Sequence, residues 1–321
     1  MYRGEAKPAP HRGVLVICGP TATGKTALGV ELALLFGGEV VSADAMQVYR
    51  GMVIGTAAPT AEECKGVRHH LIGTADPREN YSVGRYVDEA SACIDDILRR
   101  GKLPILVGGT NLYIDSLLRG IEFSDFDPEL RETLEADYAR LGGEAMLERL
   151  QAADPERAAL LHPNDKKRIL RALEVFALTG ETITAHDRAS RLAPPRYESC
   201  RIALSFEKRE DLYARIDARV DGMMKAGLVT EVRGLLDSGV PENCTAMQAI
   251  GYKEIASALR GETTLEEAAE QVKQSSRRYA KRQLSWLRRD PELHWILWKK
   301  KPDLDKASRI STQILEKSGI L

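Results

Sequence analysis

Apolar runs and amphipathic segments alternate along the first third of the chain. The run Val14–Cys18 is continuously apolar, as expected of a strand buried in a parallel sheet. The next segment, Lys25–Phe36, is typical of a helix, and Gly37-Gly38 closes it. This order of strand and helix predicts a parallel α/β sheet. Further strands are predicted at Glu39–Ser42, Pro104–Val107 and Arg201–Phe206, and a further helix at Tyr86–Arg100.

Between residues 124 and 195 the pattern changes to charged amphipathic helices. Asn164 or Asp165 can cap one of them, which ends near Gly180. Its apolar stripe of Ile169, Ala172, Leu173 and Phe176 leaves a basic face made by Lys167, Arg168 and Arg171. The sequence therefore predicts a discontinuous α/β core, residues 1–123 and 196–321, with an inserted all-helical subdomain at residues 124–195.

The last third of the chain is predicted to be mainly helical. Thr263 or Thr264, with Glu266 or Glu267 three residues later, resembles a capping box. A long helix is expected from there to about Arg289. The segment Trp295–Trp298 has the pattern of a last edge strand.

The composition is that of a folded protein of the cytoplasm. Of the 321 residues 43% are hydrophobic and 29% are charged, so the chain should bury a sizeable core. The five cysteines are scattered, without the close pairing of a zinc site or a disulfide framework, which indicates reduced thiols. The apolar run near the N-terminus is too short to span a membrane, and we expect no membrane partner.

Charge is distributed unevenly along the chain. The formal net charge of −1, taken alone, argues against a nucleic-acid partner. However, Gln271–Arg289 holds seven basic residues and no acidic one. This stretch is either a solvated helix face or a surface that neutralises phosphates. Its aromatic residues, Tyr279 and Trp286, are expected to anchor the helix to the core rather than to stack on bases.

The strongest local motif is Gly19-Pro20-Thr21-Ala22-Thr23-Gly24-Lys25-Thr26, a complete phosphate-binding loop between an apolar strand and a helix. Its backbone N–H groups and the positive end of the helix can converge on phosphate oxygens. Lys25 can reach a phosphate, and the Thr26 hydroxyl can ligate Mg²⁺. The loop predicts a diphosphate or triphosphate ligand without specifying the reaction.

Two further strand ends should open onto the same crevice. Asp44 follows the second strand, where it is a general base or, as readily, a helix cap or a metal-bound carboxylate. After the next strand, Gly108-Gly109-Thr110 permits close approach of a ligand or makes a plain turn.

Two charged or titratable pairs have ordinary explanations. His69-His70 lacks the companions of a metal site, and a structural role is favoured. Arg215 and Arg219 share a helix face with Asp211, so a solvated, salt-bridged face is expected before a phosphate clamp.

Together these segments resemble one family, the tRNA dimethylallyltransferases, over residues 14 to about 300. The resemblance is carried by the phosphate loop and by separated motifs: Ser42–Tyr49, Gly51–Ala57, His69–Leu71, Leu106–Tyr113, His162–Asp165, Arg168–Glu174, Ile250–Lys253 and Tyr279–Leu287. The chain ends without a Cys/His cluster, so it is most similar to the bacterial members.

The resemblance implies an activity with named roles. The enzyme would transfer a dimethylallyl group from dimethylallyl diphosphate to N6 of adenine 37 in the tRNA anticodon loop. Asp44 would be the general base, Thr110 would hydrogen-bond near the reacting centre, and Arg219 would contact the diphosphate. The family also implies Mg²⁺ as a cofactor, bound at Thr26, and we expect a monomer. The diphosphate would be bound by Gly19, Thr21, Ala22, Thr23, Gly24, Lys25 and Thr26.

By the same resemblance, contacts to the anticodon stem-loop are expected from six segments: Asp44, Ala45, Met46 and Gln47; Thr110; Arg131; Lys167, Arg168, Ile169, Leu170 and Arg171; Gln248, Ala249, Ile250, Gly251, Tyr252 and Lys253; and Arg277, Lys281, Arg282 and Gln283.

Two other readings of the motifs stay open. An adenylate isopentenyltransferase shares the loop and the aspartate but uses a free nucleotide, and the basic segment Lys167–Arg171 argues against it. A P-loop kinase or an ATP-dependent RNA-binding module is more remote, because the sequence has no second arginine-rich lid.

Overall fold

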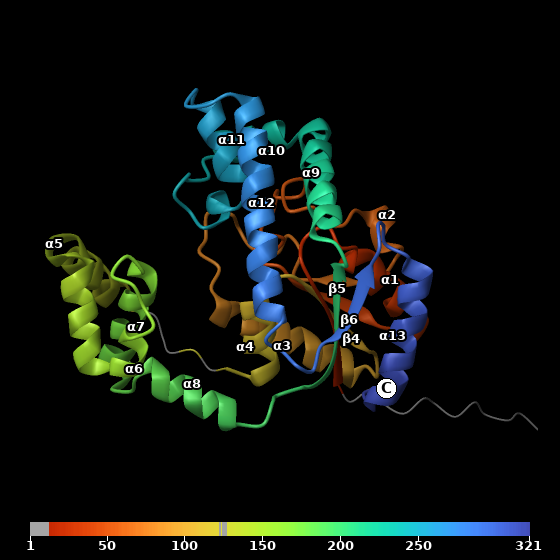
Figure 1. Cartoon of the computed structure of the whole chain (residues 1–321), viewed down its shortest axis with the longest axis horizontal. Coiled ribbons are helices and arrows are strands. Elements are labelled where there is room, and N and C mark those ends of the chain that lie inside the picture. The colour runs from red at the N-terminus through yellow and green to blue at the C-terminus, as the bar shows by residue number, and fades with distance from the viewer. Residues whose placement is uncertain (1–12, 122, 124–126) are drawn as a thin grey trace, which may run out of the picture. The chain divides into compact units, whose positions relative to one another are not determined.

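The computed structural model describes residues 13–121, 123 and 127–321, with the backbone alone at residue 191. The described chain forms two compact units (Figure 1). The core unit holds the residues up to Leu118 and those from Tyr197 to Leu321. The helical unit holds Arg119–Arg196. Part of the expected boundary region lies outside the described residues.

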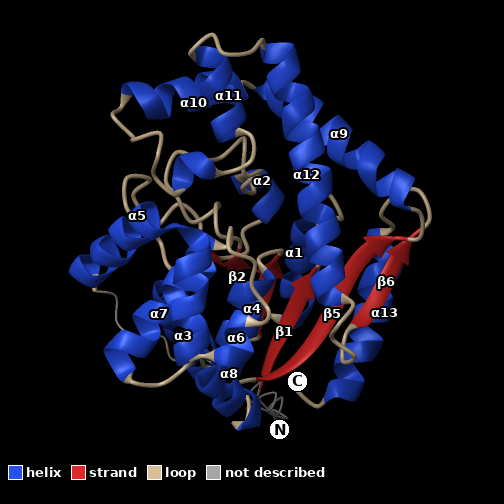
Figure 2. Cartoon of the chain, turned by 60° about the vertical axis from the view of Figure 1, so that its left-hand side comes forward, coloured by secondary structure: helices blue, strands red, loops and turns tan. Residues whose placement is uncertain are grey.

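The core unit is built on one sheet of six parallel strands, as the sequence predicted (Figure 2). The strand order is β3-β2-β4-β1-β5-β6, which places the short strand β6 at one edge. The strands are β1 (Gly13–Cys18), β2 (Glu39–Ala43), β3 (His69–His70), β4 (Pro104–Gly108), β5 (Glu198–Phe206) and β6 (His294–Trp298).

Helices cover the sheet because its central strands are apolar on both faces. Leu15 and Ile17 of β1 pack in a cluster with Leu28 of α1 and Leu315 of α13. Val16 points to the other face and is also completely buried. The helices of this unit are α1 (Lys25–Phe36), α2 (Ala61–Cys64), α3 (Val83–Arg99), α4 (Asn111–Arg119), α9 (Arg209–Ala226), α10 (Leu228–Asp237), the short 3₁₀ helix η1 (Ala246–Gln248), α11 (Tyr252–Leu259), α12 (Leu265–Leu287) and α13 (Leu304–Ser318).

The predicted helix signals are found at their expected places. Gly37 ends α1 with a left-handed backbone, and its N–H bonds to the carbonyl of Ala33. Thr264 and Glu267 form the capping box that begins α12. The carboxylate of Glu267 accepts from the Thr264 N–H, while the Glu267 N–H donates to the Thr264 hydroxyl. These caps satisfy backbone groups that a helix end would otherwise leave without partners.

The helical unit is made of α5 (Pro128–Ala153), α6 (Pro155–Ala158), α7 (Lys166–Thr179) and α8 (Ile183–Leu192). Its core includes Leu134, Met146 and Leu150 of α5. Ile169 and Leu170 of α7 complete that core and are fully buried. Their predicted contact with RNA is therefore corrected: the two side chains support the helix from inside. Phe176, expected in the apolar stripe, is 38% exposed.

The helices contain no membrane-crossing candidate within the part of the chain that the structure describes.

Candidate active site

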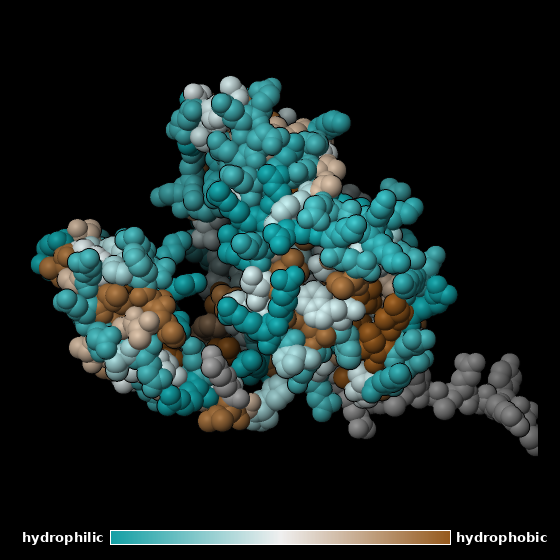
Figure 3. All heavy atoms as spheres, in the orientation of Figure 1, coloured by the Kyte–Doolittle hydropathy of each residue, from teal (hydrophilic) through white to brown (hydrophobic). Residues whose placement is uncertain are grey.

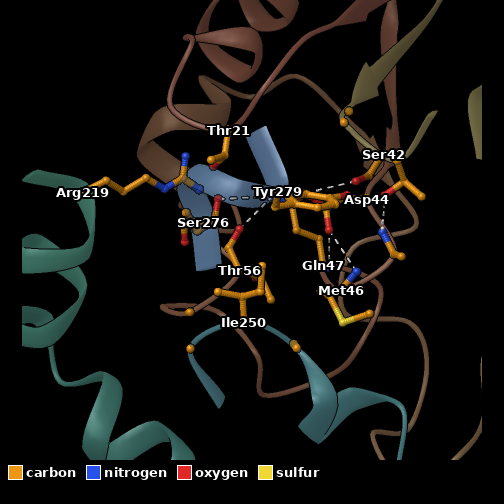
Figure 4. A pocket seen from close by; sticks show the side chains of 18 of the residues that line it. Thr21, Ser42, Asp44, Met46, Gln47, Thr56, Arg219, Ile250, Ser276 and Tyr279 are labelled. Carbon is orange, nitrogen blue, oxygen red and sulfur yellow. Dashed lines mark hydrogen bonds between the residues drawn. The ribbon is translucent and has the colours of Figure 1, made fainter. Parts of the chain in front are cut away.

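Loops from three neighbouring strands meet at the carboxyl edge of the sheet. The phosphate loop follows β1, Asp44 follows β2, and Thr110 follows β4, and these strands are adjacent in the order β2-β4-β1. Parallel strands end at the same edge, so the three loops border one cavity of about 430 Å³ (Figure 4). Thr21, Asp44 and Thr110 all line it.

The phosphate loop is held in shape by the residues around it. Gly19 has a φ of 140°, and a side chain there would meet the carbonyl oxygen of Leu204 at 2.4 Å, so glycine is required. The Thr23 hydroxyl is buried and donates to the Pro20 carbonyl over 2.8 Å. The carbonyl of Thr23 accepts from the indole of Trp298 over 2.9 Å. A preformed loop costs little to order when an anion binds.

Lys25 is the cation of the loop. Its Nζ donates to the carbonyl of Pro20 over 2.7 Å, within the loop itself. Burial, and next the nearby guanidinium of Arg219, lower the pKa of Lys25 to about 8. Thr26 lies beside it on the cavity wall. A bound anion would raise the pKa of Lys25 again, because its negative charge would stabilise the protonated amine and offset the repulsion from Arg219.

Asp44 has one of the roles that the sequence left open, that of a cap. Its Oδ1 accepts from the backbone N–H groups of Met46, at 2.9 Å, and Gln47, at 3.3 Å. Among the described residues its Oδ2 has no hydrogen-bond partner, and Figure 4 shows the side chain at the cavity wall. One oxygen therefore caps the following turn and orients the carboxylate, while the other is left for a ligand. Thr110 supports the same turn, since its Oγ1 accepts from the N–H of Ala45 over 3.0 Å.

Gly108, which ends β4, and Gly109, which follows it, allow close packing of neighbouring segments. A side chain at Gly108 would meet the carbonyl of Ala43 at 2.1 Å, and one at Gly109 would meet the amide of Gln283 at 2.3 Å. Gln283 is buried and donates from Nε2 to the carbonyl of Gly109 over 2.8 Å. This side chain joins α12 to the turn after β4 and also lines the cavity, and its predicted contact with tRNA stays a prediction.

The arginine pair of α9 differs from the sequence expectation. Instead of a salt-bridged surface with Asp211, both arginines reach toward the phosphate loop. The Nε of Arg215 donates to the carbonyl of Ala22 over 3.1 Å. Arg219 lines the cavity, and Figure 4 shows its side chain extending from α9 toward the centre of the site. Burial lowers the pKa of Arg219, and the Asp44 carboxylate opposes that effect.

Sequence reasoning misplaced Tyr279, which borders the cavity instead of anchoring α12 (Figure 4). Burial, followed by the charge of Asp44, raises the pKa of Tyr279 to about 12, so its hydroxyl stays protonated at neutral pH. The guanidinium of Arg282 lies 5.5 Å from the centre of its ring. Trp286 is not anchored in the core either: it is 43% exposed and donates to Asp115 over 2.7 Å. The sequence shows which residues share a face of the helix. It does not show which elements pack against that face, so the surroundings of Tyr279 and Trp286 could not be predicted.

The basic stretch of α12 divides into two faces. Arg277 pairs with Asp217 of α9 over 2.5 Å, and Lys273 pairs with Asp221 over 2.8 Å. These cations join two helices, and the contact of Arg277 with tRNA stays a prediction. Lys281 and Arg282 are exposed, and the surface over α11 and α12 is largely hydrophilic (Figure 3).

The segment from Gln248 to Lys253 also divides by burial. Gln248 and Lys253 are exposed, and Ile250 is half-buried at the cavity. Tyr252 is completely buried, and Ala249 and Gly251 are buried beside it. These three residues nevertheless line the cavity together with Ile250. The contacts of this segment with tRNA stay a prediction.

The predicted basic residues of the helical unit behave in two ways. Lys167 and Arg168 are exposed on α7. Arg171 and Arg131 instead meet at Glu174, whose side chain is only 1% exposed. Their nitrogens lie 2.8 and 3.7 Å from its Oε2. A buried carboxylate needs such partners, so Arg131 and Arg171 stabilise the unit, and their contact with tRNA stays a prediction.

The histidine pair is engaged within the protein. His70 Nε2 lies 2.8 Å from the buried carboxylate of Glu39, which Arg100 and Lys102 also contact. The Nδ1 of His69 lies 2.9 Å from the carbonyl of Val67, and burial lowers the pKa of His69. The described residues contain no group of three or more potential metal-ligating His, Cys, Asp or Glu side chains.

The fold and the loop geometry define a P-loop α/β protein with a helical insertion. Comparison with known proteins narrows this class. The family described as IPP transferase matches residues 47–290, and the family described as isopentenyl transferase matches residues 12–76. The chain belongs to the tRNA dimethylallyltransferase family, whose members are prenyl-transferring enzymes.

Curated relatives and solved structures agree with this assignment. The chain is 48% identical to the tRNA dimethylallyltransferase of Acetivibrio thermocellus, over 88% of this chain and 91% of the relative. It is 50% identical to that of Geobacter metallireducens, over 88% and 92%. The tRNA isopentenylpyrophosphate transferase of Bacillus halodurans has a similar structure, with a TM-score of 0.71, 41% identity, and coverage of 96% of this chain and 98% of that one. A eukaryotic dimethylallyltransferase acting on tRNA matches with a TM-score of 0.82, 29% identity, and coverage of 95% and 80%.

Proposed function

We propose that this enzyme transfers the dimethylallyl group from dimethylallyl diphosphate to N6 of adenine 37 in the anticodon loop of tRNA. The observation that carries the proposal is the shared cavity: the phosphate loop and the Asp44 carboxylate line the same space of about 430 Å³. The names of the relatives support tRNA as the acceptor. The expected monomeric state and cytoplasmic location remain predictions.

In this proposal the phosphate loop holds the diphosphate. The loop amides, Lys25 and Arg219 would contact its oxygens and stabilise the charge that develops as it leaves. The Thr26 hydroxyl on the cavity wall, together with diphosphate oxygens and water, suits Mg²⁺, which prefers hard oxygen ligands and keeps several waters. When bound, Mg²⁺ would neutralise part of the diphosphate charge.

The apolar part of the cavity would receive the five-carbon chain. Ile216 and Val220 of α9 and Val272 of α12 line the cavity together with Met223. Burying the chain against these side chains would contribute about 0.8 kcal/mol for each CH₂ group. The same wall would keep water away from the reacting carbon.

Asp44 would remove the proton that the acceptor loses. The bond between the first prenyl carbon and the diphosphate oxygen breaks, and that carbon bonds to N6. The N6 proton passes to Asp44, and the electron pair of the broken bond leaves with the diphosphate. An exocyclic adenine amine is a weak nucleophile because its lone pair is delocalised, so the base and the stabilised leaving group share the barrier. Extruding adenine from a single-stranded loop is comparatively cheap.

Exposed cations would hold the anticodon arm through its phosphates. In the helical unit these are Lys167 and Arg168, and in the core unit they are Lys253, Lys281 and Arg282.

A transfer assay with three acceptors tests the proposal. Purified protein is incubated with labelled dimethylallyl diphosphate, Mg²⁺ and either an anticodon stem-loop, the same stem-loop with guanine at position 37, or AMP. We expect label only on the first RNA. Label on AMP would favour an adenylate isopentenyltransferase, and ATP turnover without prenyl transfer would favour a P-loop kinase.

A further inference from the structure

A carboxylate outside the cavity, Glu231 of α10, organises one wall of it. Its Oε2 accepts from the backbone N–H groups of Val53, at 2.9 Å, and Ile54, at 2.7 Å. Its Oε1 accepts from the N–H of Gly55 over 3.0 Å and from the hydroxyl of Tyr252 over 2.6 Å. Four donors on one carboxylate form a strong clamp, because each bond is assisted by the negative charge.

The clamped loop is seated tightly on Tyr252. A side chain at Gly55 would meet the ring of Tyr252 at 2.5 Å, so the glycine permits the contact. Gly55, Thr56 and Ala57 line the cavity. Glu231 itself is not among the lining residues, and so it acts on the site through the residues that it holds, which are this loop and Tyr252.

The loop in turn holds Gln47. The carbonyls of Thr56 and Ala57 both accept from Gln47 Nε2 over 3.3 Å. The Oε1 of the same amide accepts from the Ser42 hydroxyl over 3.1 Å. Three of the four hydrogen bonds that the Gln47 amide can make are therefore formed within the protein, which fits a role in holding the wall. Its contact with tRNA stays a prediction.

Gln47 also forms a hydrogen bond with Asp44, the candidate general base. The backbone N–H of Gln47 donates to Asp44 Oδ1, alongside that of Met46. These two bonds hold one carboxylate oxygen and leave the other toward the cavity. A continuous series of hydrogen bonds therefore runs from Glu231 through the loop and Gln47 to Asp44.

We propose that Glu231 is a positioning residue that sets the orientation of the Asp44 carboxylate through the 53–57 loop and Gln47. The inference rests on the proposed function, in which Asp44 accepts the N6 proton. A base displaced by a fraction of an ångström from its proton loses much of its effect, while the diphosphate site on the other side of the cavity is untouched. Loss of the clamp should therefore lower kcat and leave the binding of dimethylallyl diphosphate unchanged.

The test variant is Glu231→Gln, which keeps the size of the side chain. An amide offers one acceptor oxygen, so two of the four donors lose their partner whichever way it is oriented. We expect kcat for transfer to the stem-loop to fall about tenfold, with the Kd for dimethylallyl diphosphate within about twofold of wild type. Tyr252→Phe removes one donor and leaves the loop bonds, so its kcat should fall less. Asp237→Asn removes a negative charge from an exposed site on the same helix and should leave kcat unchanged.

A double-mutant cycle separates positioning from general loss of structure. In an Asp44→Asn background, adding Glu231→Gln should lower the residual single-turnover rate less than twofold, because the group being positioned is gone. An equal tenfold loss in both backgrounds, or an unchanged kcat in Glu231→Gln alone, would overturn the inference. The stoichiometry of dimethylallyl diphosphate binding reports the folded fraction of each variant. Absence of transfer by the wild type would instead refute the proposed function itself.

Discussion

Two pairs of arginines in this protein contact different surroundings from those that the sequence predicted. Arg215 and Arg219 of α9, with the spacing of a surface salt bridge, extend to the phosphate loop and its cavity. Arg131 and Arg171 of the helical unit, expected to bind RNA, meet at a buried glutamate. The first pair forms no salt bridge with an acidic side chain within the part of the chain that the structure describes, although the charge of Asp44 acts on Arg219, whereas the second pair shares one carboxylate. Spacing along a helix shows which side chains share a face and not what that face meets.

The largest effect is expected from replacing Asp44, because this substitution removes the candidate general base. Asp44→Asn keeps an oxygen to accept from the N–H groups of Met46 and Gln47 but cannot take a proton. Single-turnover transfer should fall by about two to four orders of magnitude, with the Kd for tRNA largely kept. Asp44→Ala should lose at least as much. Wild-type turnover in Asp44→Asn would remove the general base from the proposal.

The next effect concerns the arginine that faces the cavity. Arg219→Ala should weaken binding of dimethylallyl diphosphate about a hundredfold, because a partly desolvated cation opposite the diphosphate is lost. Titration calorimetry measures the Kd, and Arg209→Ala at the exposed start of α9 is the control. Arg215→Ala should have a smaller effect, since its Nε bonds the loop carbonyl of Ala22. Equal affinities for Arg219→Ala and the control would show that α9 contributes no phosphate contact.

The third prediction concerns Glu174, the buried glutamate at which Arg131 and Arg171 meet. Glu174→Gln should destabilise the helical unit by about 2 kcal/mol, because Arg131 and Arg171 lose the charge that they share. Hydrogen exchange of α7 in the full chain measures this loss locally. Lys167→Ala, on the exposed face of the same helix, should leave that exchange unchanged. If Glu174→Gln exchanged like the wild type, the two ion pairs would contribute nothing to the stability of the unit.

The smallest expected effect is a pH dependence of diphosphate binding. The pKa of Lys25 is lowered to about 8, so its proton is lost as the pH rises through that value in the free enzyme. If the protonated form binds the diphosphate, the Kd should increase about tenfold between pH 7 and pH 9. In Lys25→Arg the dependence should disappear, since arginine stays charged. A flat profile for the wild type would mean that Lys25 is not the deciding cation.

Most of the strands and loops that border the cavity could be predicted from the sequence pattern within each segment. The continuous apolar run at Val14–Cys18 and the glycine-rich loop after it specify a strand, a turn and a helix through short-range steric and hydrogen-bonding rules. Asp44 and Thr110 follow two further apolar strands, and parallel pairing brings all such strand ends to one edge. The position of this edge could therefore be predicted without knowing any distance.

Other roles depended on contacts between residues far apart in the sequence. Tyr279 and Trp286 lie on one basic helix, yet one borders the cavity and the other is largely exposed. Glu231 is 178 residues from Val53, which it clamps, and no motif links the two.

By itself, the sequence determined the parallel sheet, the phosphate loop, the helix caps and the edge where Asp44 lies, because each depends on neighbours within a few residues or on a rule that applies to every parallel strand. Only the tertiary structure decided which charged side chains form ion pairs within the protein and which face the cavity. That decision depends on packing between elements distant in the chain, where a buried carboxylate such as Glu174 attracts any cation within reach.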